Sequence, residues 1–162
     1  MSVIDTMIGV WKFNRDRTLG TLDELAGLAD SSAVLGWRPG DGRAHIAWQL
    51  MHIAITEELF ATERMKGESP KWPDLVLRFK GGSTPDDNIP QVGQVREVLD
   101  ESRSHLIEAA SQLSEADLQT IPEAFKERGW TFGTMLKVVA WHECHHQGQA
   151  HITFNLLKAS QS

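Results

Sequence analysis

Residues 135–149 read Met-Leu-Lys-Val-Val-Ala-Trp-His-Glu-Cys-His-His-Gln-Gly-Gln, an apolar run that leads into a cluster of histidines near the C-terminal end. Apolar residues recur here every three or four positions, a spacing typical of an α-helix and not of a strand. His142 and His146 are four residues apart, so their side chains share one helix face with Cβ atoms roughly 5–6 Å apart. This spacing predicts two ligands for one metal ion on a single helix.

Three earlier segments show the same helical spacing of apolar residues. The first begins with Ser2 followed by Asp5, the pattern of a capping box. The second follows a stretch rich in turn residues, after which Asp41 is a plausible N-cap. We expect the four helices to span about Val3 to Leu28, from the cap Asp41 to near Gly67, about Gln91 to Leu113, and from between Thr131 and Thr134 through Leu157.

Residues 67–90 separate the second and third helices. They contain four prolines and several glycine and aspartate residues, a composition that breaks helices repeatedly. Their aromatic and aliphatic residues indicate a long irregular connection that packs against the protein. Within it, Leu75 to Phe79 is a short run with strand-like alternation. Beyond the third helix, Ser114 and Asp117 predict a short helical turn.

The predicted fold class is all-α. Four helices of this length around one core indicate a four-helix bundle, formed by a single domain over residues 1–162. Because the connection between helices 2 and 3 is long, the helices need not simply alternate up and down. The interior of such a bundle is a common place for metals held by side chains on facing helices.

A third ligand is expected from the second helix, where His45 and His52 lie on one stripe with Trp48 between them. His52 is the candidate. His45 lies a heptad away, roughly 10 Å along the helix axis, so at most one of the two is a primary ligand. The alternative interpretation is that these histidines only satisfy their ring nitrogens in the core or at the surface.

Two other candidate metal ligands project from the opposite face of the same helix. On a helical wheel, Cys144 falls about 200° and His151 about 180° from His142, so neither can bind the same ion, and Cys144 is interpreted as a small packed residue. His145 and His105 are expected at the surface or beside the site.

The string His-Glu-x-x-His at residues 142–146 also matches the motif of zinc peptidases, in which the glutamate is a general base. The extended form of that motif fails by one position at two places, because Gly148 comes five residues after Glu143 and His151 nine after His142. A flanking hydrogen-bond or surface role for Glu143 is therefore favoured, with the role of catalytic base left open.

Composition excludes several classes of protein. There are 16 Lys and Arg against 22 Asp and Glu, a formal net charge of −6, and no basic run to contact nucleic-acid phosphates. Cys144 is the only cysteine, which excludes an intrachain disulfide and favours a reduced setting. The N-terminal residues fit neither a signal peptide nor a membrane span. We expect a soluble cytoplasmic protein without membrane or nucleic-acid partners.

Four apolar residues of the first helix, Val3, Met7, Val10 and Phe13, lie off its main apolar stripe. They predict either a homodimer interface or a surface that the long connection covers.

Two segments carry a resemblance to a known family: residues 43–54, Arg-Ala-His-Ile-Ala-Trp-Gln-Leu-Met-His-Ile-Ala, and residues 141–149, Trp-His-Glu-Cys-His-His-Gln-Gly-Gln. Together with Gly-Trp-Arg-Pro-Gly at 36–40, they resemble the DinB-like family of bacterial metal-dependent proteins over nearly the whole chain. The family is similar to transferases and isomerases that use the thiols mycothiol or bacillithiol. The resemblance implies a four-helix bundle with a divalent metal on His52, His142 and His146.

These observations lead to an expected function. A divalent ion that suits imidazole ligands, Zn or Ni, would activate a bound water or a low-molecular-weight thiol for attack on a small electrophilic substrate. Glu143 or Gln149 would orient the nucleophile. The resemblance favours thiol transfer, and the His-Glu-x-x-His string favours hydrolysis. A non-catalytic metal- or ligand-binding protein, related to stress, is the alternative from another class.

Overall fold

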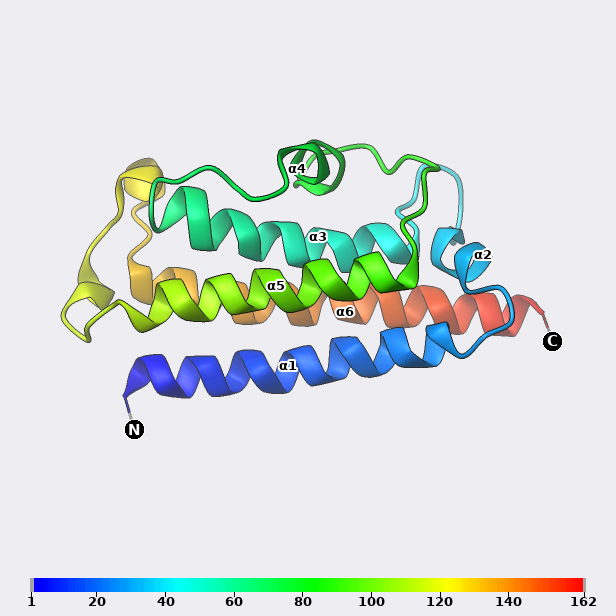
Figure 1. The fold of residues 1–162 in the computed structure, drawn as a ribbon, viewed down its shortest axis with the longest axis horizontal. Helices are drawn as coiled ribbons and strands as arrows, with labels where there is room; N and C mark the ends of the chain where they lie inside the picture. Colours follow the sequence, from blue (N-terminus) through cyan, green and yellow to red (C-terminus); the bar gives the residue numbers. More distant parts are fainter. Residues whose placement is uncertain (1, 162) are drawn as a thin grey trace.

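The computed structural model describes residues 2–161, and all of the regular secondary structure in this range is helical, with no strand. The all-α prediction is confirmed. Its long helices lie side by side along the longest axis of the molecule (Figure 1). They are α1 (Val3–Ala26), α3 (Ile46–Leu59), α5 (Val92–Ser111) and α6 (Phe132–Ser160).

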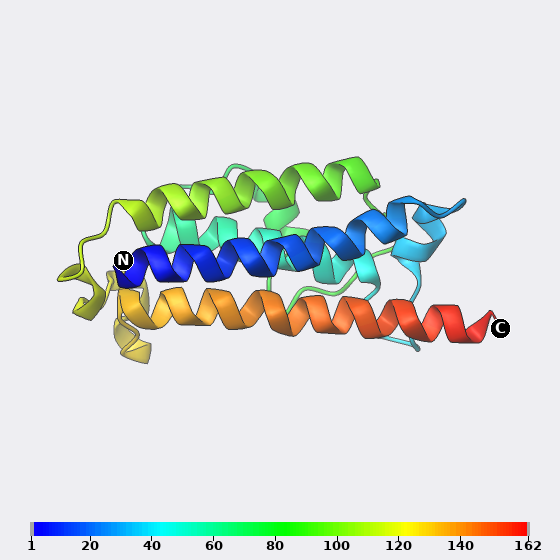
Figure 2. The same cartoon turned by 90° about the horizontal axis from the view of Figure 1, so that it is seen from below.

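The long helices form a ring in which each packs on two neighbours. Helix α3 packs against α5 and α6, and α1 packs against the same two helices. Helices α1 and α6 run in one direction and α3 and α5 in the other, as the colours in Figures 1 and 2 show. Because α3 and α5 are parallel, the chain must return along the bundle between them, and residues 65–91 make that return. A long connection therefore gives the bundle its non-alternating order.

The returning segment contains helix α4 (Pro73–Phe79), so the connection is not irregular throughout as predicted, and the alternating run Leu75 to Phe79 is helical. Alternation over five residues does not distinguish a strand from a short helix with one buried face, and Pro73 at the first helical position favours the helix. Phe79 is buried in the core, whereas Leu77 points to solvent. The prediction of a packed connection is thus met through one face of α4.

Smaller elements differ from the sequence expectation at the ends of the long helices. The first helix ends at Ala26 and is followed by the unpredicted helix α2 (Ser31–Gly36), whose cap Asp30 accepts from the Ala33 N–H at 3.0 Å. The predicted turn near Asp117 is η2 (Asp117–Gln119), and η3 (Glu123–Arg128) was not foreseen. The second helix continues past α3 as a π-helical turn, η1 (Phe60–Arg64).

Helix α3 begins one turn later than predicted, and its N-cap is His45 instead of Asp41. The His45 Nδ1 atom accepts a hydrogen bond from the Trp48 N–H at 3.0 Å, and Nε2 lies 2.9 Å from the Asp86 carbonyl oxygen, to which it donates. Both ring nitrogens are therefore engaged in capping α3 and in holding the connection. This removes His45 from the candidate metal ligands.

Two apolar clusters fill the bundle, one toward each end. The first is centred on α3 and includes Leu22, Leu50 and Phe154, and the second includes Trp11, Leu106 and Val139. Buried polar side chains also occur in the interior, namely Arg15, Thr18, Glu57, Ser102, Arg103 and Glu143. The long helices therefore also meet through polar side chains in the bundle interior.

None of the helices within residues 2–161 combines the length and apolar character needed to cross a membrane. Val3, Val10 and Phe13 are exposed on α1, so the long connection does not cover them. Dimerisation through this face stays a prediction.

The His45 cap should make stability depend on pH. Burial lowers the pKa of His45 below its usual value, with a smaller contribution from the positive charge of Arg38. Below about pH 6.5 the His45 imidazole is protonated in the unfolded chain but stays neutral in the folded state. The stabilisation is complete above that pH and is lost as pH falls toward the lower folded pKa. In His45→Asn, a non-titrating cap replaces the imidazole, so we expect its free energy of unfolding to fall less than that of wild type between about pH 7 and pH 5.

Urea unfolding at several pH values measures this difference, and because the other histidines are common to both proteins their titration cancels. Parallel pH profiles for the two proteins would contradict the proposed cap.

Candidate metal centre

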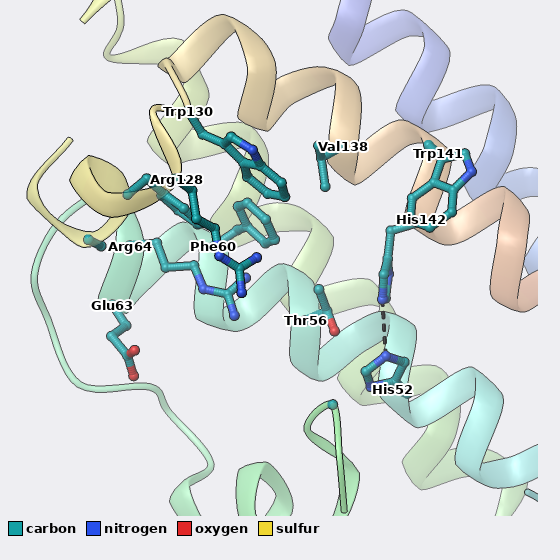
Figure 3. A pocket seen from close by; sticks show the side chains of 13 residues that line it. His52, Thr56, Phe60, Glu63, Arg64, Arg128, Trp130, Val138, Trp141 and His142 are labelled. Atoms are coloured by element: carbon teal, nitrogen blue, oxygen red, sulfur yellow. Dashed lines mark hydrogen bonds between the residues drawn. The ribbon is translucent and has the colours of Figure 1, made fainter. Parts of the chain in front are cut away.

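Three imidazoles converge between α3 and α6. His52 comes from α3, and His142 and His146 come from consecutive turns of α6. One ring nitrogen from each lies within 4.8 Å of the other two, and the ring centroids are 4.4–4.8 Å apart. In Figure 3 the His142 and His52 rings point toward one another across the gap between the helices. The sequence prediction that these three histidines meet agrees with this arrangement.

Hydrogen bonds on the outer side of two rings fix which nitrogen faces inward. The His52 Nδ1 atom lies 2.6 Å from the Phe79 carbonyl oxygen. A carbonyl can only accept, so Nδ1 carries the proton and Nε2 keeps a lone pair. That Nε2 lies 3.0 Å from Nε2 of His142. His146 Nδ1 likewise lies 2.6 Å from Oε1 of Gln49 and donates to it, as ligand histidines commonly do to an outer acceptor.

The donor set fits a divalent ion of borderline softness. Zinc–imidazole bonds are about 2.0–2.1 Å long, so nitrogens on a shared ion lie at most about 4.2 Å apart. A shift of the rings by less than about 1 Å brings the three nitrogens within that limit. Three protein ligands leave coordination positions for other molecules, the arrangement of a catalytic and not of a structural site.

The electrostatic environment keeps these histidines neutral. Burial lowers the pKa of His142 and of His146 to about 3, and the neighbouring imidazoles contribute to both shifts. Burial also lowers the pKa of His52. Neutral imidazole is the form that binds a metal ion. Near neutral pH these histidines are already neutral, so no proton has to leave an imidazolium before a metal binds.

A pocket of about 430 Å³ opens onto the cluster (Figure 3). His52 and His142 form part of its wall, and aromatic side chains form much of the remainder: Phe60, Phe125, Trp130 and Trp141. A small molecule that enters this pocket therefore reaches the open side of the three-histidine cluster.

Glu143 faces away from the histidines, into the interior of the bundle. Its Oε1 atom accepts from Arg15 Nε at 2.7 Å and from Thr18 Oγ1 at 2.9 Å, and its Oε2 atom accepts from Arg103. Glu57 accepts from the same two arginines. Burial lowers the pKa of Arg103, but Glu57 and Glu143 raise it more, so the net shift is upward. This arrangement favours the flanking hydrogen-bond role for Glu143 over that of a general base.

The remaining candidates lie outside the cluster. Gln149 Nε2 donates to Nε2 of the exposed His145 at 2.6 Å, which engages its amide away from the three inward nitrogens. His105 pairs with the buried Glu58 at 2.7 Å. Cys144 is exposed, so the expectation of a packed cysteine was wrong. The part of its thiol that neighbouring residues cover, followed by the charge of Glu143, raises the pKa of the thiol.

Sequence reasoning missed two groups that hold the ligands. Gln49 precedes His52 by three residues and so shares its helix face, a spacing that could have revealed it. The Phe79 carbonyl has no side-chain signature at all. Gly81 follows closely, and a Cβ atom there would lie 3.8 Å from the His52 ring. The connection between α3 and α5 therefore forms part of the site.

A helical bundle in which three neutral imidazoles meet beside a pocket has the donor set of a divalent-metal centre. The family comparison agrees: the sequence profile of the DinB superfamily matches residues 11–150, and the chain belongs to this superfamily. The matched region includes all three histidines. Among curated proteins, no sequence matches the chain.

A substitution at Glu143 should reduce stability, and a substitution at Gln49 should reduce metal affinity. Glu143→Gln leaves two buried arginines with one carboxylate, a loss that costs about 3–5 kcal/mol of stability, and metal affinity should stay unchanged. Gln49→Leu removes the acceptor that orients His146, so we expect metal affinity to fall about 10–100-fold. Urea unfolding of the metal-free proteins and competitive zinc titration measure the two effects. Loss of metal binding in a folded Glu143→Gln protein would argue against a purely structural role for Glu143.

Proposed function

We propose that this member of the DinB superfamily is a metal-dependent enzyme that transfers a thiol to a small electrophilic substrate. The convergence of His52, His142 and His146 beside an open pocket, whose wall includes His52 and His142, is the observation that carries the proposal. A divalent ion bound there would lower the pKa of a thiol or water molecule toward neutrality. Zn or Ni suits a set of imidazole donors.

The chain itself contributes position and environment. Hydrogen bonds to the Phe79 carbonyl and to Gln49 keep the donor nitrogens of His52 and His146 directed inward. The Thr56 hydroxyl lies on the pocket wall one turn from His52 (Figure 3) and is available to hold a proton of the bound nucleophile. The aromatic side chains on the wall make the surroundings of a bound molecule less polar than water, which strengthens electrostatic interactions there.

The partners of Glu143 bear on the choice between thiol transfer and hydrolysis. Hydrolysis of the zinc-peptidase type needs the Glu143 carboxylate as a base beside the ion. Both oxygens of that carboxylate are instead bound by arginines. The open pocket also favours catalysis over an ion that only braces the helices, because a bracing site needs no access. Thiol transfer is therefore the first proposal and hydrolysis by another base the second.

We expect the purified protein, prepared without a polyhistidine tag, to bind about one divalent ion per chain, and His142→Ala to lose this binding together with activity. Elemental analysis after dialysis against zinc or nickel measures the stoichiometry. His151→Ala is the matched control, because His151 is exposed on the same helix. A full equivalent of metal retained by His142→Ala would remove the proposal.

The same preparations separate the two reactions. Metal-loaded protein is incubated with an activated aryl halide, with and without a low-molecular-weight thiol such as cysteine. Thiol transfer requires product that contains the thiol and depends on both metal and thiol. Release of halide at the same rate without thiol would favour hydrolysis.

A further inference from the structure

The pocket beside the histidines contains two arginines that lack carboxylate partners. Arg64 is the last residue of η1 and Arg128 the last residue of η3, and both line the pocket. In Figure 3 their guanidinium groups lie together and point into the cavity between α3 and α6. Each contacts aromatic rings, but neither forms an ion pair with any carboxylate within residues 2–161.

The proximity of these two cations is unfavourable unless something negative joins them. Burial lowers the pKa of the half-buried Arg64, the charge of the adjacent Glu63 raises it in part, and the charge of Arg128 lowers it again. Glu63 lines the same pocket, yet its carboxylate points away from both guanidinium groups in Figure 3. Other arginines of the described residues have carboxylate partners, as in Arg78 with Asp86 at 2.8 Å, or are exposed, as Arg17 and Arg43 are. What distinguishes Arg64 and Arg128 is that two unpaired arginines line the same pocket.

Aromatic side chains hold both guanidinium groups in place. Arg64 lies 4.4 Å from the Phe60 ring centroid and 5.7 Å from that of Phe125, and Arg128 lies 5.3 Å from that of Trp130. Such stacking orients the planar fork of an arginine and leaves its N–H groups free to bind an oxyanion.

The π-helical turn contributes to the position of Arg64. Residues four apart drift about 40° around an α-helix at each step, so a wall made of His52, Thr56 and Phe60 would rotate out of line before residue 64. At this point the Met65 N–H donates to the Phe60 carbonyl at 3.1 Å, a bond across five residues that widens the turn. The wider turn counteracts the drift and keeps Arg64 on the pocket wall.

We propose that Arg64 and Arg128 bind the anionic group of the substrate, a carboxylate or a similar organic oxyanion, while its apolar body lies against the aromatic walls. This inference rests on the proposed function for the position of the reacting group, which is placed at the three histidines. The pocket thus selects small organic acids with an apolar body, and the two arginines determine that specificity through bidentate charge-assisted hydrogen bonds.

The test compares 2-naphthoate with its neutral analogue 2-naphthamide by calorimetric titration. Wild type should bind the acid about tenfold or more tightly than the amide. The exposed residue Arg128 is changed first, as R128Q, which should reduce this preference, and R64Q/R128Q should abolish it. R17Q is the matched control, because Arg17 stacks on Phe13 of α1 outside the pocket, and it should keep the preference of wild type.

Each titration is made with metal-free and with zinc-loaded protein. A preference that depends on the arginines in both forms supports the proposal even if the metal proves unnecessary for activity, which separates it from the proposed function. Failure of the acid to bind, equal affinity for acid and amide, or an acid preference that survives in folded R64Q/R128Q would overturn it. If the preference survives only in the zinc-loaded form, the carboxylate binds the metal instead.

Discussion

A buried ionic network of Arg15, Glu57, Arg103 and Glu143 takes one residue from each of the long helices α1, α3, α5 and α6. Because each carboxylate binds both arginines, the helices cannot slide along one another without separating charges in the bundle interior, where water cannot compensate. The network therefore sets the axial register of α3 against α6. His142 directly precedes Glu143, and His52 lies on the same helix as Glu57, so the register that satisfies the charges is also the register in which the imidazoles meet.

The two faces of α6 thus have different roles. The face with Glu143 contributes to the buried ionic network, and the face with His142 and His146 contributes two of the three clustered imidazoles. This division accounts for a His-Glu-x-x-His string whose glutamate is not beside the ion site. It also places the site at a helix contact that is fixed on one side by charge and on the other by the connection through α4, whose Phe79 carbonyl holds His52.

Much of this could be predicted from the sequence, and the limits have physical reasons. Periodicity located the long helices because their apolar residues recur every three or four positions, even in α3, which is buried on all sides. Four-residue spacing placed His142 and His146 on one face. The start of α3 was missed because His45 caps it through a ring nitrogen, an uncommon acceptor at that position. The outer partners of the ligands could not be foreseen fully, since a backbone carbonyl carries no residue-specific signal. Arg64 and Arg128 come together only through tertiary packing, so nothing in their spacing joins them.

The ligand set has a consequence for how the protein matures. His52 and His142 face one another but are 90 residues apart in the chain, and the later histidines belong to the last helix. A nascent polypeptide that has not yet released α6 from the ribosome can offer an ion one imidazole of the three. The three imidazoles can therefore meet around an ion only after α6 has packed against α3, so a site of this kind would be completed by folding of the bundle and not by an early part of the chain.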